Sequence, residues 1–409
     1  MAKARPGGAV RLIDGGSVTS PQGFVAGGVY AGIKAAGKGK LDLGILASER
    51  PAACAAMFTR STVKGFGVLV SAMHARRGAA RAVIVNSGCS NVATGRQGML
   101  DALEMAELAA ARLGIAGAEV LVGSTGVIGR PLPMPLIRDG APRIKLGADG
   151  GAAFARAIIT TDTYAKTLAV RFRAGGREYR IGAAAKGSGM IHPDMATMFC
   201  FLTTDAPVEL AFLRRTLREA VGDSLNMISV DNDTSTSDTV AIFANGAAGG
   251  AAIYAGSPGA AAFASALPDV CVRVAKLLAR DGEGAKKLIE ARVEGAGSAG
   301  EARAAARTIT ASPLVKTAVH GNDPNWGRLL MAVGRSGAGI DLERARAWIG
   351  PTMVYRGEPV RFDERAVSRY LRGEEVVLRV DLGRGFDSAT AWGCDMTPEY
   401  VHINADYRT

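Results

Sequence analysis

The sequence predicts an α/β protein in which helices and strands are stacked in layers. Short apolar runs of strand length, such as residues 82–85 and 239–243, alternate with longer segments of helical composition. Gly175-Gly176 divides residues 167–184 into two stretches of alternating character, which indicates a hairpin. The chain has 409 residues and 48% of them are apolar, so it is long enough for two or three domains with buried cores.

In the first half, the clearest elements are a strand, a helix and a second strand. Residues 82–85 form a short apolar run that predicts a buried strand. Residues 98–113 are rich in Leu, Ala, Met and Glu, and Gly114 is the residue type that commonly ends a helix. Residues 119–122 predict the next strand, which should lead into a tight glycine turn at 123–129.

In the second half, an apolar run after Thr197 predicts a strand. The next segment predicts a helix with one apolar face, made by Leu210, Leu213, Leu217 and Val221. Residues 239–243 predict a further strand, and residues 246–260 are glycine-rich and form the loosest segment. Alanine-rich helices are expected up to about residue 290, and short strands and helices alternate from there to the end.

Composition argues against a membrane protein and against a nucleic-acid partner. No run approaches the roughly 18 apolar residues that a membrane span needs, and the basic start, residues 1–8, has no apolar core of a secretory signal. The formal net charge is +11, but the lysines and arginines are dispersed among acids and no basic motif is interleaved with aromatics. A solvated basic surface explains this charge better than a nucleic-acid site.

The cysteines and histidines indicate neither disulfides nor a metal site. Five cysteines are scattered along the chain without metal-ligand spacing, which is typical of reduced thiols in a cytoplasmic protein. The four histidines show no pairing at ligand spacing, so no bound metal is expected.

The segment with the most chemical content is residues 186–198, Lys-Gly-Ser-Gly-Met-Ile-His-Pro-Asp-Met-Ala-Thr-Met. A glycine turn leads through a proline to Thr197, which stands at the mouth of the predicted strand. A threonine hydroxyl needs a base beside it to act as a nucleophile, and its own α-amine can serve once the preceding bond is cut. The alternative is that Thr197 is an ordinary β-branched residue that starts a buried strand.

Residues 186–206 closely resemble the signature of the ornithine acetyltransferase family. Members of this family are bifunctional glutamate N-acetyltransferases of arginine biosynthesis. Further segments match this family in order along the chain: 124–129, 160–163, 233–239, 281–284, 321–328 and the carboxy-terminal Asn404. The resemblance implies a layered α-β-β-α sandwich that cuts itself at the Ala196–Thr197 bond. Residues 1–196 and 197–409 would then be two interleaved chains of one folded body.

The resemblance also implies an activity. Thr197 would take an acetyl group from N2-acetyl-L-ornithine as an ester and pass it to L-glutamate in a two-step, ping-pong reaction. Acetyl-CoA is a second candidate donor, and neither a metal nor a resident cofactor is expected. The two fragments would pair with each other, and two cleaved chains would form a heterotetramer.

The site residues carried over from the family fall into two groups. Thr125 and Gly126 would form the oxyanion hole that stabilises the tetrahedral intermediate. A charged amino-acid substrate must be paired or hydrogen-bonded when it is buried. The residues that match the family's substrate site are Thr160, Thr161, Lys186, Thr197, Glu283, Asn404 and Thr409. Of the first two, either threonine could face the substrate.

Other interpretations involve the same residues. The related aminopeptidase and amidase branch uses a similar self-generated nucleophile with water as the acceptor, so a hydrolase is one alternative. A paralogue that acylates in secondary metabolism, or that only binds, is another. The chain departs from the family pattern at Cys89-Ser90, at His192 and in its tail, residues 406–409, and these positions bear on substrate preference.

Overall fold

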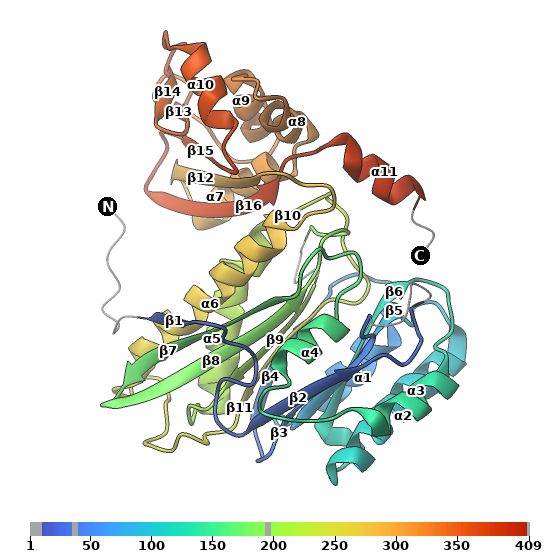
Figure 1. Cartoon of the computed structure of the whole chain (residues 1–409). Helices are drawn as coiled ribbons and strands as arrows, with labels where there is room; N and C mark the ends of the chain where they lie inside the picture. Colours follow the sequence, from blue (N-terminus) through green and yellow to red (C-terminus); the bar gives the residue numbers. More distant parts are fainter. Residues whose placement is uncertain (1–9, 35–39, 193–197, 407–409) are drawn as a thin grey trace.

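The centre of the fold is a pair of β-sheets that pack face to face, as seen in the computed structural model (Figure 1). The structure describes residues 10–34, 40–192 and 198–406. The central sheet has six strands, in the spatial order β1 (Arg11–Ile13), β7 (Lys166–Ala174), β8 (Arg177–Lys186), β9 (Phe199–Thr204), β11 (Thr239–Ala244) and β4 (Ala53–Phe58). The second sheet has four strands, in the order β2 (Phe24–Val29), β3 (Leu43–Ser48), β5 (Ala82–Cys89) and β6 (Val120–Val127).

Strand β9 shows how the sequence builds two cores at once. Every residue of β9 is buried, and successive side chains of a strand point to opposite faces. Phe199 and Phe201 therefore pack between the two sheets, where Val83 and Val85 of β5 also lie. Cys200, one position along, packs with the helices on the outer face of the central sheet. A continuous apolar run is what a strand covered on both faces requires.

Helices cover the outer face of each sheet. The four-stranded sheet packs against α1 (Phe66–Ala75), α2 (Gly95–Leu113) and α3 (Met134–Arg143). The central sheet packs against α5 (Leu210–Gly222) and α6 (Ala260–Arg280). The short helix α4 (Gly151–Ala157) contacts both sheets. This confirms the expected layered α-β-β-α sandwich.

The central sheet combines strands from both sides of residues 196 and 197. Strand β8 precedes this point in the chain and pairs antiparallel with β9, which follows it. Strand β11 is parallel to β9 on one side and antiparallel to β4, an early strand, on the other. Segments 1–196 and 197–409 thus share one sheet and do not form separate domains.

The C-terminal part of the chain forms a second, smaller body around a third sheet (Figure 1). Its strands are, in spatial order, β10 (Ile228–Ser229), β16 (Asp387–Cys394), β12 (Leu288–Ala296), β15 (Glu375–Asp381), β13 (Arg346–Ile349) and β14 (Thr352–Arg356). The helices of this part are α7 (Ala299–Ala311), α8 (Pro313–Gly321), α9 (Trp326–Gly334), α10 (Glu364–Leu371) and α11 (Pro398–Asp406). Two short 3₁₀ turns, η1 (Gly117–Glu119) and η2 (Leu225–Met227), complete the described elements.

Several elements end at the residues where the sequence predicted their ends. Helix α2 ends before Gly114, which has a left-handed φ of 65°, and the β7–β8 hairpin turns at Gly175 and Gly176, with φ of 56° and 79°. The expectation of helices up to residue 290 is wrong at its end, since α6 ends at Arg280 and strand β12 begins at Leu288. The first four residues of β12, 288–291, are all buried, and this burial depends on packing that only the folded chain provides.

The tight turn expected at residues 123–129 is also wrong. Strand β6 continues through Thr125 and Gly126 to Val127, because it pairs in parallel with β5 along this length. The pairing contains a bulge where Gly88 and Gly126 meet, with φ of 114° and 126°. A Cβ atom at residue 126 would lie 2.4 Å from the carbonyl carbon of Gly88. Glycine is therefore needed here for a close backbone approach inside a sheet, not for a turn.

Candidate active site

A pocket of about 170 Å³ brings together residues that are far apart in the sequence. It lies where strands β6 and β8 end, beside the start of β9. The residues that line it are Ser90, Thr125, Gly126, Ile128, Thr160, Thr161, Lys186, Gly189, Met190, Met198, Phe199, Ser235, Thr236, Ser237, Asp238, Glu283 and Asn404. Seven of the site residues predicted from the sequence are in this list, namely Thr125, Gly126, Thr160, Thr161, Lys186, Glu283 and Asn404, and Ser90, one of the departures from the family pattern, lines the pocket as well. Three others, Ala196, Thr197 and Thr409, lie outside the described residues.

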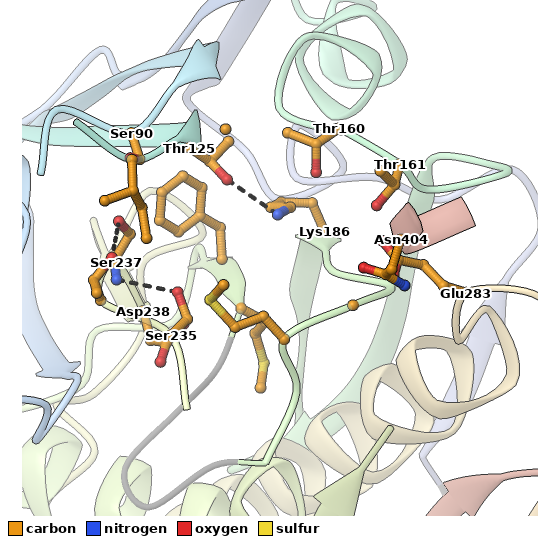
Figure 2. A pocket seen from close by; sticks show the side chains of 17 residues that line it. Ser90, Thr125, Thr160, Thr161, Lys186, Ser235, Ser237, Asp238, Glu283 and Asn404 are labelled. Atoms are coloured by element: carbon orange, nitrogen blue, oxygen red, sulfur yellow. Dashed lines mark hydrogen bonds between the residues drawn. The ribbon is translucent and has the colours of Figure 1, made fainter. Parts of the chain in front are cut away.

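Thr125 and Gly126 stand at the end of β6, at the bulge. The Thr125 side chain faces the pocket, and the Lys186 ammonium donates a hydrogen bond to its Oγ1 at 3.1 Å (Figure 2). A bulge interrupts the regular hydrogen-bond ladder, so backbone groups at this point can serve other partners. A hydroxyl and backbone donors next to a cation form a suitable environment for a developing oxyanion.

Lys186 is the last residue of β8 and carries a cation into the pocket. Burial lowers its pKa below the usual lysine value, and the neighbouring Lys166 acts in the same direction. The carboxylates of Asp162, Asp238 and Glu283 oppose this effect. The ammonium is therefore stabilised mainly by acids that surround it rather than by water.

The two threonines of the 160–163 segment differ in their contacts. Thr161 Oγ1 lies 2.7 Å from the hydroxyl of Ser188. The Thr160 backbone N–H donates to Asp162 at 3.0 Å, while its hydroxyl has no hydrogen-bond partner within the described chain. Both residues line the pocket, and Thr160 is the one with a hydroxyl available to a ligand.

Glu283 and Asn404 meet at the far side of the pocket from Ser235 and Asp238 (Figure 2). The Asn404 amide donates to Glu283 Oε2 at 2.9 Å, and it also donates to the carbonyl of Tyr400 within α11. The Glu283 backbone N–H donates to the carbonyl of Ser188 at 2.8 Å. Helix α11 is thereby connected to the loop after Lys186 through one residue, Glu283, which uses its carboxylate for Asn404 and its backbone N–H for Ser188.

The segment Ser235–Asp238 is a part of the pocket to which sequence reasoning gave no role. Asp238 is 2% exposed, and its Oδ2 atom has no hydrogen-bond partner among the described residues. Burial raises the pKa of this carboxyl well above its usual range, although hydrogen bonds from Ser235 and Thr59 and the charge of Lys186 act against it.

The available signals for this segment were its match to the family, as part of residues 233–239, and its position before a predicted strand. Residue 239 starts β11, which pairs in parallel with β9 from Phe199 onward, so residue 238 lies beside Met198. Strand 239–243 was predicted correctly, but its parallel partner could not be read from the local pattern. Residues 198 and 238 lie side by side only because β11 pairs with β9.

Comparisons with known proteins agree with this arrangement. The sequence profile of the ArgJ family matches residues 25–409. The arginine biosynthesis bifunctional protein ArgJ of Symbiobacterium thermophilum is 53% identical over 397 residues, which cover 96% of this chain and 99% of that protein. The chain belongs to the ArgJ family.

Further ArgJ proteins support the assignment. The ArgJ of Dehalococcoides mccartyi is 47% identical over 401 residues, covering 98% of this chain and 99% of that protein. A crystal structure of ArgJ from Bacillus halodurans, 42% identical, covers 52% of this chain and 100% of its own, with a TM-score of 0.51. The predicted family and the predicted class, an acyltransferase enzyme of arginine biosynthesis, are confirmed. The comparisons do not favour the hydrolase or the secondary-metabolism alternative.

Neither a membrane-spanning helix nor a metal-ligand cluster occurs among the described residues. No helix in residues 10–34, 40–192 and 198–406 is long and apolar enough to cross a membrane. In the same residues, no group of three or more His, Cys, Asp or Glu side chains is arranged so that it could hold a metal ion.

Proposed function

We propose that this ArgJ protein transfers an acetyl group from N2-acetyl-L-ornithine to L-glutamate through an acetyl ester on Thr197. The observation that supports this most directly is a pocket that holds a cation, Lys186, and a carboxylate, Glu283, beside Thr125 and Gly126. Acetylornithine carries an α-carboxylate and a side-chain ammonium. These two charges can pair with Lys186 and Glu283, respectively.

The chemistry proceeds in two balanced halves. The Thr197 hydroxyl adds to the acetamide carbonyl, its proton passes to the departing nitrogen, and ornithine leaves as the C–N bond breaks. The amine of glutamate then attacks the ester, and the Thr197 hydroxyl is restored. The α-amine of Thr197, with a pKa near 8 in free peptides, serves as the base. Thr125 and Gly126 stabilise each oxyanion by about 3 kcal/mol per donor.

This scheme requires that Thr197 be an amino terminus. We propose that its hydroxyl attacks the Ala196 carbonyl and that water then opens the resulting ester, which gives fragments 1–196 and 197–409. Met198 and Phe199 line the pocket, so the described chain after the cleavage point enters it directly. Two cleaved chains would assemble as a heterotetramer.

Other features of the proposal concern donor and location. Acetyl-CoA would serve as a second donor by acetylating the same Thr197 hydroxyl with release of the thiol, and no resident cofactor is needed. All five cysteines are buried and unpaired in the structure. This is compatible with a reducing compartment such as the cytoplasm.

A kinetic prediction tests transfer against hydrolysis. With acetylornithine and glutamate varied together, double-reciprocal plots should be parallel, because ornithine leaves before glutamate reacts. Released ornithine should be matched by acetylglutamate when glutamate is saturating. Acetylornithine and acetyl-CoA are assayed as separate donors, and acetate production is followed in parallel. If acetate matches ornithine under saturating glutamate, the protein is an amidase and the transferase proposal fails.

A second prediction concerns the tail. Asn404→Ala removes an amide that holds Glu283, so the carboxylate is less well placed for the ornithine ammonium. Because the contact is exposed, we expect KM for acetylornithine to rise only about threefold to tenfold, with little change in kcat. His402→Ala, on the exposed surface of the same helix, is the matched control and should leave KM unchanged. Equal KM values in wild type and Asn404→Ala would remove Asn404 from the substrate site.

A further inference from the structure

A cluster of three buried charges is hydrogen-bonded to segments that carry residues of the pocket. The Lys166 ammonium is 2.6 Å from Asp162 Oδ1 and 2.5 Å from Asp281 Oδ2. The side chains of Lys166 and Asp162 are 0% exposed, and that of Asp281 is 3% exposed. We call Asp162, Lys166 and Asp281 the buried ion cluster.

Each carboxylate of the cluster holds a segment that carries pocket residues. Asp162 accepts hydrogen bonds from the backbone N–H of Thr160 at 3.0 Å and of Gly187 at 2.7 Å. Thr160 lines the pocket, and Gly187 directly follows Lys186. Asp162 therefore fixes the backbone on both sides of the site, at one threonine and at the lysine.

Asp281 does the same for the third segment. It accepts a hydrogen bond from the backbone N–H of Thr163 at 3.1 Å and a short one from the Thr163 hydroxyl. It follows the last residue of α6, two residues before Glu283. One lysine thus connects the three segments that supply Thr160, Lys186 and Glu283.

The charges of the cluster do not cancel. Two carboxylates and one ammonium sum to a net charge of −1 at side chains that are shielded from solvent, and a buried charge without a full partner is costly. The Asp162 carboxylate attracts the Lys186 ammonium, and it also accepts a hydrogen bond from the backbone N–H of Gly187, the next residue in the chain. The cluster and Lys186 together are neutral.

We propose that Asp162 and Lys166 are positioning residues that set the charge state and the placement of Lys186 in the pocket. The proposal rests on the proposed function only where Lys186 is taken to bind the substrate carboxylate. Asp162 supplies the anion that keeps the Lys186 ammonium in place. Lys166 weakens the effect of Asp162 on Lys186, because its ammonium pairs with Asp162 as well as with Asp281.

The charged groups around Lys186 define the expected signs. Those that act on its ammonium are Asp162, Lys166, Asp238 and Glu283, and Lys34 lies near enough to Lys186 to repel it. Burial lowers the pKa of Lys186, Asp162 raises it, and Lys166 lowers it. Removing the Asp162 charge should lower this pKa further, and removing the Lys166 charge should raise it.

The test uses the full-length protein and three variants. Asp162→Asn keeps the size of the side chain and removes the anion. Lys166→Met removes the cation. Lys166→Met combined with Asp281→Asn removes one charge of each sign and leaves Asp162 ionised. The control is Lys316→Met, which removes another fully buried lysine, on α8, whose ammonium contacts the carbonyl and sulfur of Cys394.

The readout is the pKa of Lys186, measured by pulses of deuterated acetic anhydride at a series of pH values and mass spectrometry of the Lys186 peptide. We expect the pKa of Lys186 to decrease in Asp162→Asn, to increase in Lys166→Met and in the double variant, and to keep its wild-type value in Lys316→Met. In Asp162→Asn, KM for glutamate at mildly alkaline pH should rise roughly tenfold. Thermal unfolding of each variant verifies that it is folded.

The outcomes separate this inference from the proposed function. Opposite shifts in Asp162→Asn and Lys166→Met support the role of the buried ion cluster. Loosened packing alone would shift the pKa of Lys186 in the same direction in both variants. Shifts in one direction for both variants, or none in Asp162→Asn, would overturn it. If Lys166→Met does not fold, Asp162→Asn and the double variant decide. Opposite shifts with unchanged KM would support the cluster but refute the binding of the substrate carboxylate by Lys186.

Discussion

We expect the Thr197→Ala chain to remain a single full-length band on a denaturing gel and to show no acetyl transfer. Alanine has no hydroxyl, so it can neither attack the Ala196 carbonyl nor carry the acetyl group. Both losses should be complete within the sensitivity of the assay, since maturation and turnover use the same oxygen. Denaturing electrophoresis with amino-terminal sequencing, and an acetylglutamate assay on the same sample, measure the two events separately.

Two further variants complete this experiment. Thr197→Ser loses only a methyl group, so it should retain part of both cleavage and transfer. Thr317→Ala, an exposed threonine on α8, is the control for the substitution itself and should behave as wild type. Active enzyme that consists of one uncut chain would falsify self-cleavage as a requirement.

The second large effect is expected for Thr125→Ala. Loss of one oxyanion donor typically reduces kcat by about 10²–10³, or roughly 3–4 kcal/mol of transition-state stabilisation. The variant also removes the acceptor that lies 3.1 Å from the Lys186 ammonium. We therefore expect the fall in kcat to be accompanied by a smaller rise in KM.

Thr125→Ser is the matched control, because it keeps the hydroxyl. It should restore most of kcat, as determined by steady-state kinetics on processed enzyme with an unchanged unfolding temperature. Thr125 is only 8% exposed, so the unfolding curve is needed to exclude a packing defect. A wild-type rate in Thr125→Ala would show that the oxyanion is stabilised elsewhere.

Local signals predicted the elements whose ends depend on one residue type. Gly114 ends α2 through its left-handed backbone, and Gly175-Gly176 turns the β7–β8 hairpin, because glycine adopts these conformations without steric cost. The stretch 123–129 has the same kind of glycines but a different outcome. There Gly126 is required by Gly88 of a neighbouring strand, and this contact is not visible in the local sequence.

The site shows the same division. Thr125, Lys186, Glu283 and Asn404 were identified by their motifs, and the pocket brings them together although they come from distant segments. Asp238 was missed because its place depends on the parallel pairing of β11 with β9.

The charges of Asp162, Lys166 and Asp281 were missed for a related reason. Two of them are four residues apart, but Asp281 is 115 residues beyond Lys166. A lysine with acids at such separations is usually solvated, and only the folded chain shows that water is excluded from all three.

The mixed strand order of the central sheet has a consequence for refolding after denaturation. The bond proposed to be cut, Ala196–Thr197, lies in the segment between β8 and β9. These two strands are also joined directly by the hydrogen bonds of the sheet. The proposed cleavage would thus leave the native sheet intact while dividing the polymer in two. Folding before the cut is a first-order process of one chain, whereas recovery after the cut requires two fragments to meet. The rate of recovery would then depend on protein concentration. After dilution of the denatured mature protein, partly formed sheets would keep unpaired edges for longer.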